Sequence, residues 1–147
     1  MTVEYIYKRI YGIDICSIKE IVEELAVTKL FRTPEILPGV TNLRGKILAV
    51  INIGELFKLQ AANNKNTKRK FIIITEPNGK EAALTVDNII EVKWINENDF
   101  QDIPETIENE EKKFLSALIQ TNASPIPVID AKKLLEDEIW KKITGGF

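Results

Sequence analysis

Short runs of β-branched and aromatic residues alternate with turn residues along most of the chain, a pattern that is typical of strands. In the first half the pattern predicts strands over residues 3–10, 11–16, 19–30, 39–47 and 48–52. In the second half it predicts strands over residues 70–75, 81–86, 90–96, 114–121 and 126–129. The segment Glu76-Pro77-Asn78-Gly79-Lys80 predicts a hairpin turn. The chain is therefore expected to be all-β, with about five strands in each half.

Helical periodicity is expected at the C-terminus, where apolar residues recur every four positions at Ala131, Leu135, Ile139 and Ile143. The preceding polar stretch, residues 96–113, is interrupted by Pro104 and predicts a long loop. One C-terminal helix that packs on a β-structure is the resulting expectation.

A polar and basic connection, residues 61–70, separates the two halves. We expect one domain over residues 1–147, with one subdomain near 1–64 and another near 65–147 and a possible exchange of a strand or helix between them. The basic residues of the connection leave a nucleic-acid-binding β-barrel open as an alternative, although no aromatic residues are interleaved with them.

The two halves share two sequence signatures in the same order. Residues 50–57 match residues 128–135, each a strand that ends on a short polar residue, Asn52 or Asp130, suited to cap a helix. Likewise the alternating positions from Ile13 to Ile21 match those from Leu84 to Val92. These signatures favour two small β-barrels related by a pseudo-twofold axis, against the alternative that apolar strands are alike by chance.

Composition narrows the possible functions. The 147 residues include 20 Lys and Arg against 22 Asp and Glu, a net charge of −2, and no histidine. The absence of histidine removes catalytic triads and histidine-ligated metals, and a net negative charge argues against nucleic-acid binding. The single Cys16 lies in an apolar run and is expected to be a buried, inert thiol.

An enzyme built on this chain would have to use carboxylates, and a small carboxylate-based enzyme is a second alternative. The acidic pairs, such as Glu23 with Glu24, are more simply interpreted as solvated surface. No catalytic residue, metal ligand or cofactor site is therefore predicted. No apolar stretch reaches the roughly 18 residues of a membrane span, so a soluble cytoplasmic protein without membrane insertion is expected.

The segment Pro38-Gly39-Val40-Thr41-Asn42-Leu43-Arg44-Gly45-Lys46-Ile47 predicts a strand with an arginine at its turn. A hairpin tip there would hold the Arg44 guanidinium away from the barrel, where it can bind a partner. The alternative is an arginine whose stem covers its own barrel edge. The flanking glycines, Gly39 and Gly45, serve either a positive φ or the close approach of another backbone.

This segment, together with Tyr11-Gly12-Ile13-Asp14-Ile15 and Ile18-Lys19-Glu20-Ile21, resembles the CheW family of bacterial chemotaxis coupling proteins. The second half resembles the family in Ala83-Leu84-Thr85-Val86-Asp87 and in Pro127-Val128-Ile129-Asp130. The resemblance covers nearly the whole chain. It implies two Src-homology-3-like five-stranded β-barrels and a C-terminal helix.

The resemblance also implies a function: a non-catalytic adaptor, recruited to membrane-associated chemoreceptor arrays. Its partners would be the cytoplasmic tip of a methyl-accepting chemoreceptor and the regulatory domain of the histidine kinase CheA. Carried over by position, the receptor-binding residues of the family fall on Ile18, Glu20, Gly39, Asn42, Leu43 and Arg44. The kinase-binding residues are not assigned.

Overall fold

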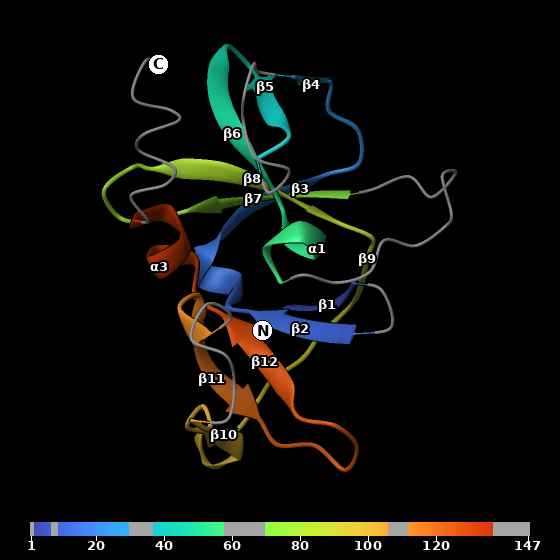
Figure 1. Cartoon of the computed structure of the whole chain (residues 1–147), viewed down its shortest axis with the longest axis vertical. Helices are drawn as coiled ribbons and strands as arrows, with labels where there is room; N and C mark the ends of the chain where they lie inside the picture. Colours follow the sequence, from blue (N-terminus) through green and yellow to red (C-terminus); the bar gives the residue numbers. More distant parts are fainter. Residues whose placement is uncertain (1, 7–8, 30–36, 58–69, 106–111, 137–147) are drawn as a thin grey trace.

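Two β-sheets form two lobes that lie one above the other along the long axis of the molecule (Figure 1). The structure, a computed structural model, describes residues 2–6, 9–29, 37–57, 70–105 and 112–136. The C-terminal part of the predicted helix, with Ile139 and Ile143, and most of the basic connection lie outside these residues.

The first sheet contains the strands of residues 18–86, in the order β3-β7-β8-β6-β5-β4. All neighbours are antiparallel except β6 and β8, which are parallel. The strands are β3 (Ile18–Val22), β4 (Val27–Thr28), β5 (Gly39–Leu43), β6 (Lys46–Asn52), β7 (Lys70–Thr75) and β8 (Glu81–Val86).

The second sheet combines the first two strands of the chain with the last four, in the order β10-β11-β12-β2-β1-β9. Here β2 and β12 form the parallel pair. The strands are β1 (Thr2–Ile6), β2 (Arg9–Ile13), β9 (Asn88–Val92), β10 (Phe100–Gln101), β11 (Leu115–Ile119) and β12 (Ile126–Ile129).

The two sheets have the same topology. Taken from one edge to the other, the strands β9-β1-β2-β12-β11-β10 of the second sheet correspond in order to β3-β7-β8-β6-β5-β4 of the first. Both sequence repeats fit this equivalence, since β6 matches β12 and the β2–β3 pair matches β8–β9. Without the two-residue strands β4 and β10, each sheet has five strands. The predicted all-β fold with two five-stranded, Src-homology-3-like subdomains is confirmed.

The chain crosses between the sheets near Asp14–Ser17 and again at Asp87. Each sheet consequently takes strands from both sides of residue 64, so the predicted division there is not the division between the sheets. The physical reason is that β3 and β9 each leave the sheet of the preceding hairpin and pair in the other sheet.

Two short helices follow the equivalent strands β6 and β12. Helix α1 (Ile53–Leu56) begins at Asn52, whose Oδ1 accepts a hydrogen bond from the Glu55 backbone N–H at 3.3 Å. Helix α3 (Ala131–Glu136) begins after Asp130, whose Oδ1 accepts from the Lys133 N–H at 3.2 Å. Both predicted N-caps are confirmed. The structure also contains the 3-10 turns η1 (Ile15–Ser17) and η2 (Glu97–Asp99).

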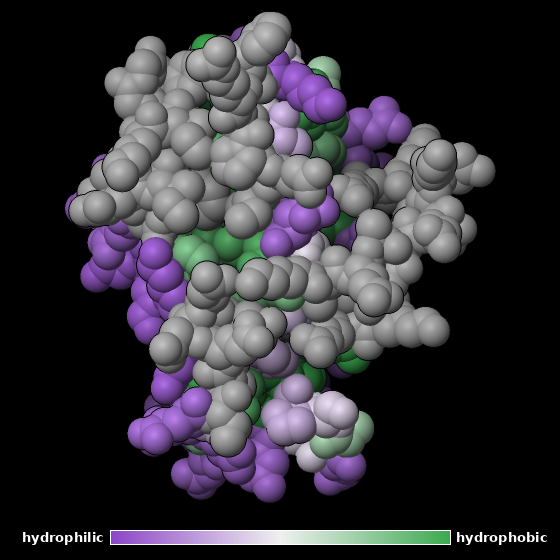
Figure 2. All heavy atoms as spheres, in the orientation of Figure 1, coloured by the Kyte–Doolittle hydropathy of each residue, from purple (hydrophilic) through white to green (hydrophobic). Residues whose placement is uncertain are grey.

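The largest apolar core lies between the two sheets and includes residues from both sheets and from α3, such as Ile13, Leu84 and Leu134. A second cluster, with Val50 and Ile73, covers the other face of the first sheet. Strands β7 and β8 are buried on both faces, which explains their nearly continuous apolar sequences. In Figure 2, hydrophobic side chains are visible in the middle of the face, at the level of α1 and α3.

Candidate functional site

The predicted hairpin tip is formed by Arg44 and Gly45. The pairing of Leu43 with Lys46 leaves these two residues as the loop between β5 and β6. Their φ angles are +51° and +87°, as a two-residue type I′ turn requires. The Asn42 Oδ1 accepts a hydrogen bond from the Gly45 N–H at 2.8 Å and closes the turn. The prediction of an arginine at a hairpin tip is therefore confirmed.

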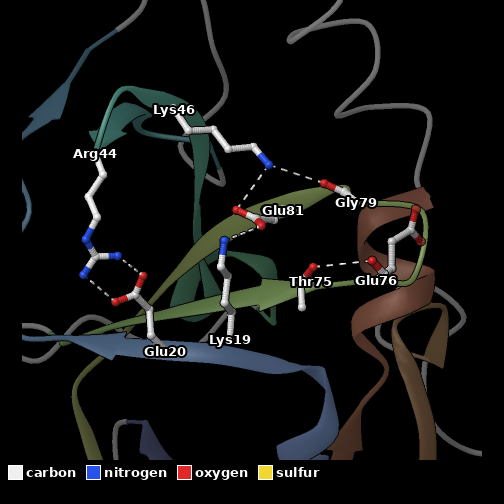
Figure 3. A network of polar contacts seen from close by, with 8 residues as sticks. All are labelled: Lys19, Glu20, Arg44, Lys46, Thr75, Glu76, Gly79 and Glu81. Atoms are coloured by element: carbon white, nitrogen blue, oxygen red, sulfur yellow. Dashed lines mark hydrogen bonds and ion pairs between the residues drawn. The ribbon is translucent and has the colours of Figure 1, made fainter.

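Arg44 pairs with Glu20 of β3 through both terminal guanidinium nitrogens, Nη1 to Oε1 at 2.5 Å and Nη2 to Oε2 at 3.0 Å (Figure 3). The Arg44 side chain is 72% exposed and that of Glu20 is 23% exposed. The hydrogen bond from Arg44 holds the pKa of Glu20 below its ordinary value, and the same bond raises the pKa of Arg44. The site presents a planar, charged group whose outer face remains open to solvent.

A β-bulge places two consecutive charged residues of β3 on the same side. The register between β3 and β7 shifts between Ile18 and Glu20, so Lys19 is the extra residue. Side chains of consecutive residues normally point to opposite faces of a strand, and a bulge changes this. In Figure 3 both Lys19 and Glu20 extend from β3 toward the hairpin and β8.

Lys19 and Lys46 both bind Glu81 at the start of β8, with N–O distances of 2.8 Å and 3.4 Å. We refer to Lys19, Glu81 and Lys46 as the Glu81 cluster. The pKa of Glu81 is lowered first by the hydrogen bond from Lys19 and then by Lys46, against the opposing effect of burial. The sequence analysis missed this cluster because its three residues belong to three different strands.

The other predicted site residues, Ile18, Leu43 and Gly39, make packing contacts. Leu43 packs against the cluster that contains Val50, and Ile18 packs against the core between the sheets. Gly39 is buried at the opposite end of β5, and a Cβ there would lie 2.1 Å from the Thr28 carbonyl oxygen of β4. The structure thus brings Glu20, Asn42, Leu43 and Arg44 together, and it gives Gly39 a packing role at a distance from the tip.

Several large apolar side chains remain exposed outside the hairpin. Ile21 of β3 is exposed, as are Ile90 and Val92 of β9, and Trp94 just beyond β9 is 97% exposed. Such residues commonly mark protein-protein contacts when they gather.

A groove of about 690 Å³ lies at the end of the parallel pairing between β2 and β12, bordered by Ile10, Tyr11, Ile126 and Pro127 and by residues of the β11–β12 loop. Pro127 has no N–H with which to extend the pairing.

In the described part of the chain, Cys, Asp and Glu residues form no group of three that could hold a metal ion. Glu20 and Glu81 have lowered pKa values, the opposite of what a carboxylic general acid needs. Cys16 is exposed in the η1 turn, so the expectation of a buried thiol was wrong, because the apolar run around it turns there between β2 and β3.

No helix among the described residues has the length and hydrophobicity needed to span a membrane. Of the basic residues of the connection, Lys70 is described and lies half-buried at the start of β7; Lys65, Lys68 and Arg69 lie outside the described residues.

Comparison with known proteins agrees with this geometry. A crystal structure of the scaffolding protein TtCheW from Thermoanaerobacter tengcongensis superposes with a TM-score of 0.76 at 30% sequence identity, covering 87% of this chain and 86% of that one. The chemotaxis protein CheW of Treponema pallidum is 27% identical over 141 residues, 94% of this chain and 82% of its own length. The CheW of Klebsiella aerogenes is 29% identical over 129 residues, 87% of this chain and 76% of its own length. A profile of the CheW-like domain matches residues 4–138, and the chain therefore belongs to the CheW-like domain family, whose members are non-catalytic adaptors in chemotaxis.

Proposed function

We propose that the chain couples chemoreceptors to the histidine kinase CheA, with the receptor tip bound at Arg44. The observation that carries this proposal is the exposed guanidinium at a rigid hairpin tip, held by Glu20 and by the closed turn. Arginine in such a position offers several directed donors to carbonyl or carboxylate groups of a partner.

A receptor helix would supplement this polar contact with apolar ones. Ile47 of β6 is exposed and pairs with Asn42 beside the hairpin tip, so it offers apolar surface to an amphipathic helix near the charged anchor. Ile18 packs β3, the strand that carries Glu20, against the core between the sheets. Leu43 packs the hairpin that carries Arg44 against the second apolar cluster.

The kinase regulatory domain would bind at a separate surface, which lets one adaptor hold both partners. The groove between β2 and β12 is mainly apolar, lies in the other lobe, and opens beside the β11–β12 loop. Weak contacts on two faces gain strength when many adaptors are held in one array, and such binding would recruit the protein to membrane-associated receptors.

The test is a binding titration with two variants, Arg44→Ala and Lys80→Ala. Lys80 is an exposed lysine at the β7–β8 turn of the same lobe and provides a matched control for loss of positive charge. We expect Arg44→Ala to weaken binding of a receptor cytoplasmic fragment by about 30-fold, equivalent to about 2 kcal/mol. Binding of the CheA regulatory domain should be unchanged.

Receptor affinity that stays the same in a folded Arg44→Ala protein would contradict the assignment of the receptor site. Failure of the wild-type protein to bind either partner would contradict the coupling function itself. Isothermal titration calorimetry measures both affinities, and circular dichroism checks the fold of each variant.

A further inference from the structure

The Glu81 cluster joins three strands directly beneath the Arg44 hairpin (Figure 3). The Glu81 side chain is 8% exposed, and each of its oxygens binds a different lysine, Lys19 of β3 and Lys46 of β6. The Lys46 Nζ also donates to the Gly79 carbonyl oxygen at 3.5 Å, in the turn before β8. One carboxylate therefore connects β3, β6 and β8.

Each lysine of the cluster lies beside a member of the Arg44–Glu20 pair. Lys19 immediately precedes Glu20 on the bulged strand, and Lys46 follows Arg44 by two residues at the start of β6. The contact of Lys46 with Glu81 holds the hairpin arm, and the contact of Lys19 holds the bulge. The two contacts together restrict the distance between the strands that carry Arg44 and Glu20.

The carboxylate of the Glu81 cluster is more buried than that of the Arg44–Glu20 pair. This difference indicates which of the two ionic contacts positions the strands. Because the Arg44 side chain is 72% exposed, water and salt compete for its contact with Glu20, and this pair holds its geometry less firmly than a buried pair would. A carboxylate as buried as Glu81 loses much of its hydration, so leaving it unpaired is costly. Leaving the Glu81 carboxylate unpaired is therefore more costly than leaving the more exposed Glu20 carboxylate unpaired.

We propose that Glu81 is a positioning residue for the Arg44 docking site: through Lys19 and Lys46 it sets the geometry in which Arg44 meets Glu20. The effect on receptor binding rests on the proposed function. The effect on the Arg44–Glu20 pair does not, and it can be measured in the protein alone.

The first experiment follows the titration of the Glu20 carboxyl by carbon-detected NMR in the wild-type protein, in Glu81→Gln and in Glu97→Gln. Glu97 is an exposed glutamate in η2 of the other lobe and serves as the matched control. If Glu81 positions the pair, its loss lets Arg44 and Glu20 separate, and the pKa of Glu20 rises toward its ordinary value. The control should leave that pKa unchanged.

The sign of the change separates positioning from a simple charge effect. Removing a nearby negative charge and freeing Lys19 would by themselves lower the pKa of Glu20 further. A Glu20 pKa that falls or stays constant in Glu81→Gln would overturn the proposal. If Glu81→Gln does not fold, Glu81→Met gives the same test, since an apolar residue of similar length tolerates burial and both lysines are exposed.

The second experiment is a double-mutant cycle on receptor-fragment affinity. Glu81→Gln is expected to weaken binding about fivefold in the wild-type background and to have no further effect in Arg44→Ala. An equal loss in both backgrounds would show that Glu81 acts elsewhere and would overturn the proposal. If the wild-type protein does not bind the receptor fragment, the proposed function fails, and the Glu20 titration still decides the role of Glu81.

Discussion

Gly39 and Gly45 flank the same strand but meet different physical requirements. Gly45 has a φ of +87° and open space around it, so it is needed for its backbone conformation. Gly39 has no such φ, and it is needed because the β4 backbone approaches closely. The sequence left both reasons open for both glycines, since a glycine carries no side chain that would reveal which one applies.

Arg44 occupies the left-handed region without being glycine, at φ +51°. This conformation costs an L-residue roughly 1 kcal/mol. The bonds from Arg44 to Glu20 and from Gly45 to Asn42 hold the turn in place. Glycine would adopt this conformation at a lower energetic cost. The presence of arginine at this position therefore agrees with a functional role for its side chain.

The charged residues of this lobe predict a pH-dependent stability. The pKa of Glu81 lies below its ordinary value of 4.5 because of the hydrogen bond from Lys19, and Glu20 is shifted in the same direction by Arg44. The unfolded chain therefore binds more protons than the folded one as the pH falls below about 4.5, and stability is lost there. At neutral pH this contribution is fully present.

Urea denaturation at about pH 6 and about pH 3 measures the effect. The unfolding free energy of the wild-type protein should fall more between these two pH values than that of Glu81→Gln, which lacks one of the shifted carboxyls. Identical losses in the two proteins would contradict the contribution of Glu81.

Among the elements, the edge strand β4 lies unusually close to the backbone of its neighbour at a single residue, Gly39. It has two residues, Val27 and Thr28, which pair with Thr41 and Val40 of β5. The buried Thr41 hydroxyl also donates to the Ala26 carbonyl oxygen at 2.8 Å. The close approach at Gly39 allows this short strand to stay beside β5.

Gly39→Ala should therefore destabilise the protein by more than about 2 kcal/mol, because the new Cβ meets rigid backbone. Gly54→Ala is the control. There the nearest contact is the Asn52 side-chain oxygen at 3.3 Å, and a change of less than about 1 kcal/mol is expected in a helix. Urea denaturation compares the two, and equal effects would contradict the packing role of Gly39.

For the whole molecule, the interleaving of the sheets has a direct consequence for folding. Residues 1–64 lack β7 and β8, two interior strands of the first sheet, and residues 65–147 lack β1 and β2 of the second. The core between the sheets also takes residues from both parts, such as Ile13 and Leu134. Neither part contains a complete sheet or a complete core.

Fragments 1–64 and 65–147 are accordingly expected to be unfolded when separate and to fold when mixed. Two-dimensional NMR of each fragment and of the mixture measures this, since a folded β-protein has well-dispersed amide signals. A dispersed spectrum from either fragment alone would contradict the interdependence of the two lobes.

Features that depend on neighbouring residues could be predicted before the fold was known. Most strands follow from apolar patterns, the caps at Asn52 and Asp130 from short polar residues before helices, and the Arg44 turn from the adjacent glycine. Their bounds were predicted less well, because the predicted strand of residues 39–47 contains the turn between β5 and β6, and the predicted loop of residues 96–113 contains β10. The repeats also indicated two equivalent subdomains. Each of these features is set by interactions within a few residues along the chain.

Long-range features required the tertiary structure. The crossing of β3 and β9 between sheets, the bulge at Lys19 and the exposure of Cys16 all depend on where distant strands lie. The Glu81 cluster is the clearest case, because Lys19 and Glu81 are separated by 62 residues in the chain. No local pattern relates two such residues, and folding is what brings their charges within bonding distance.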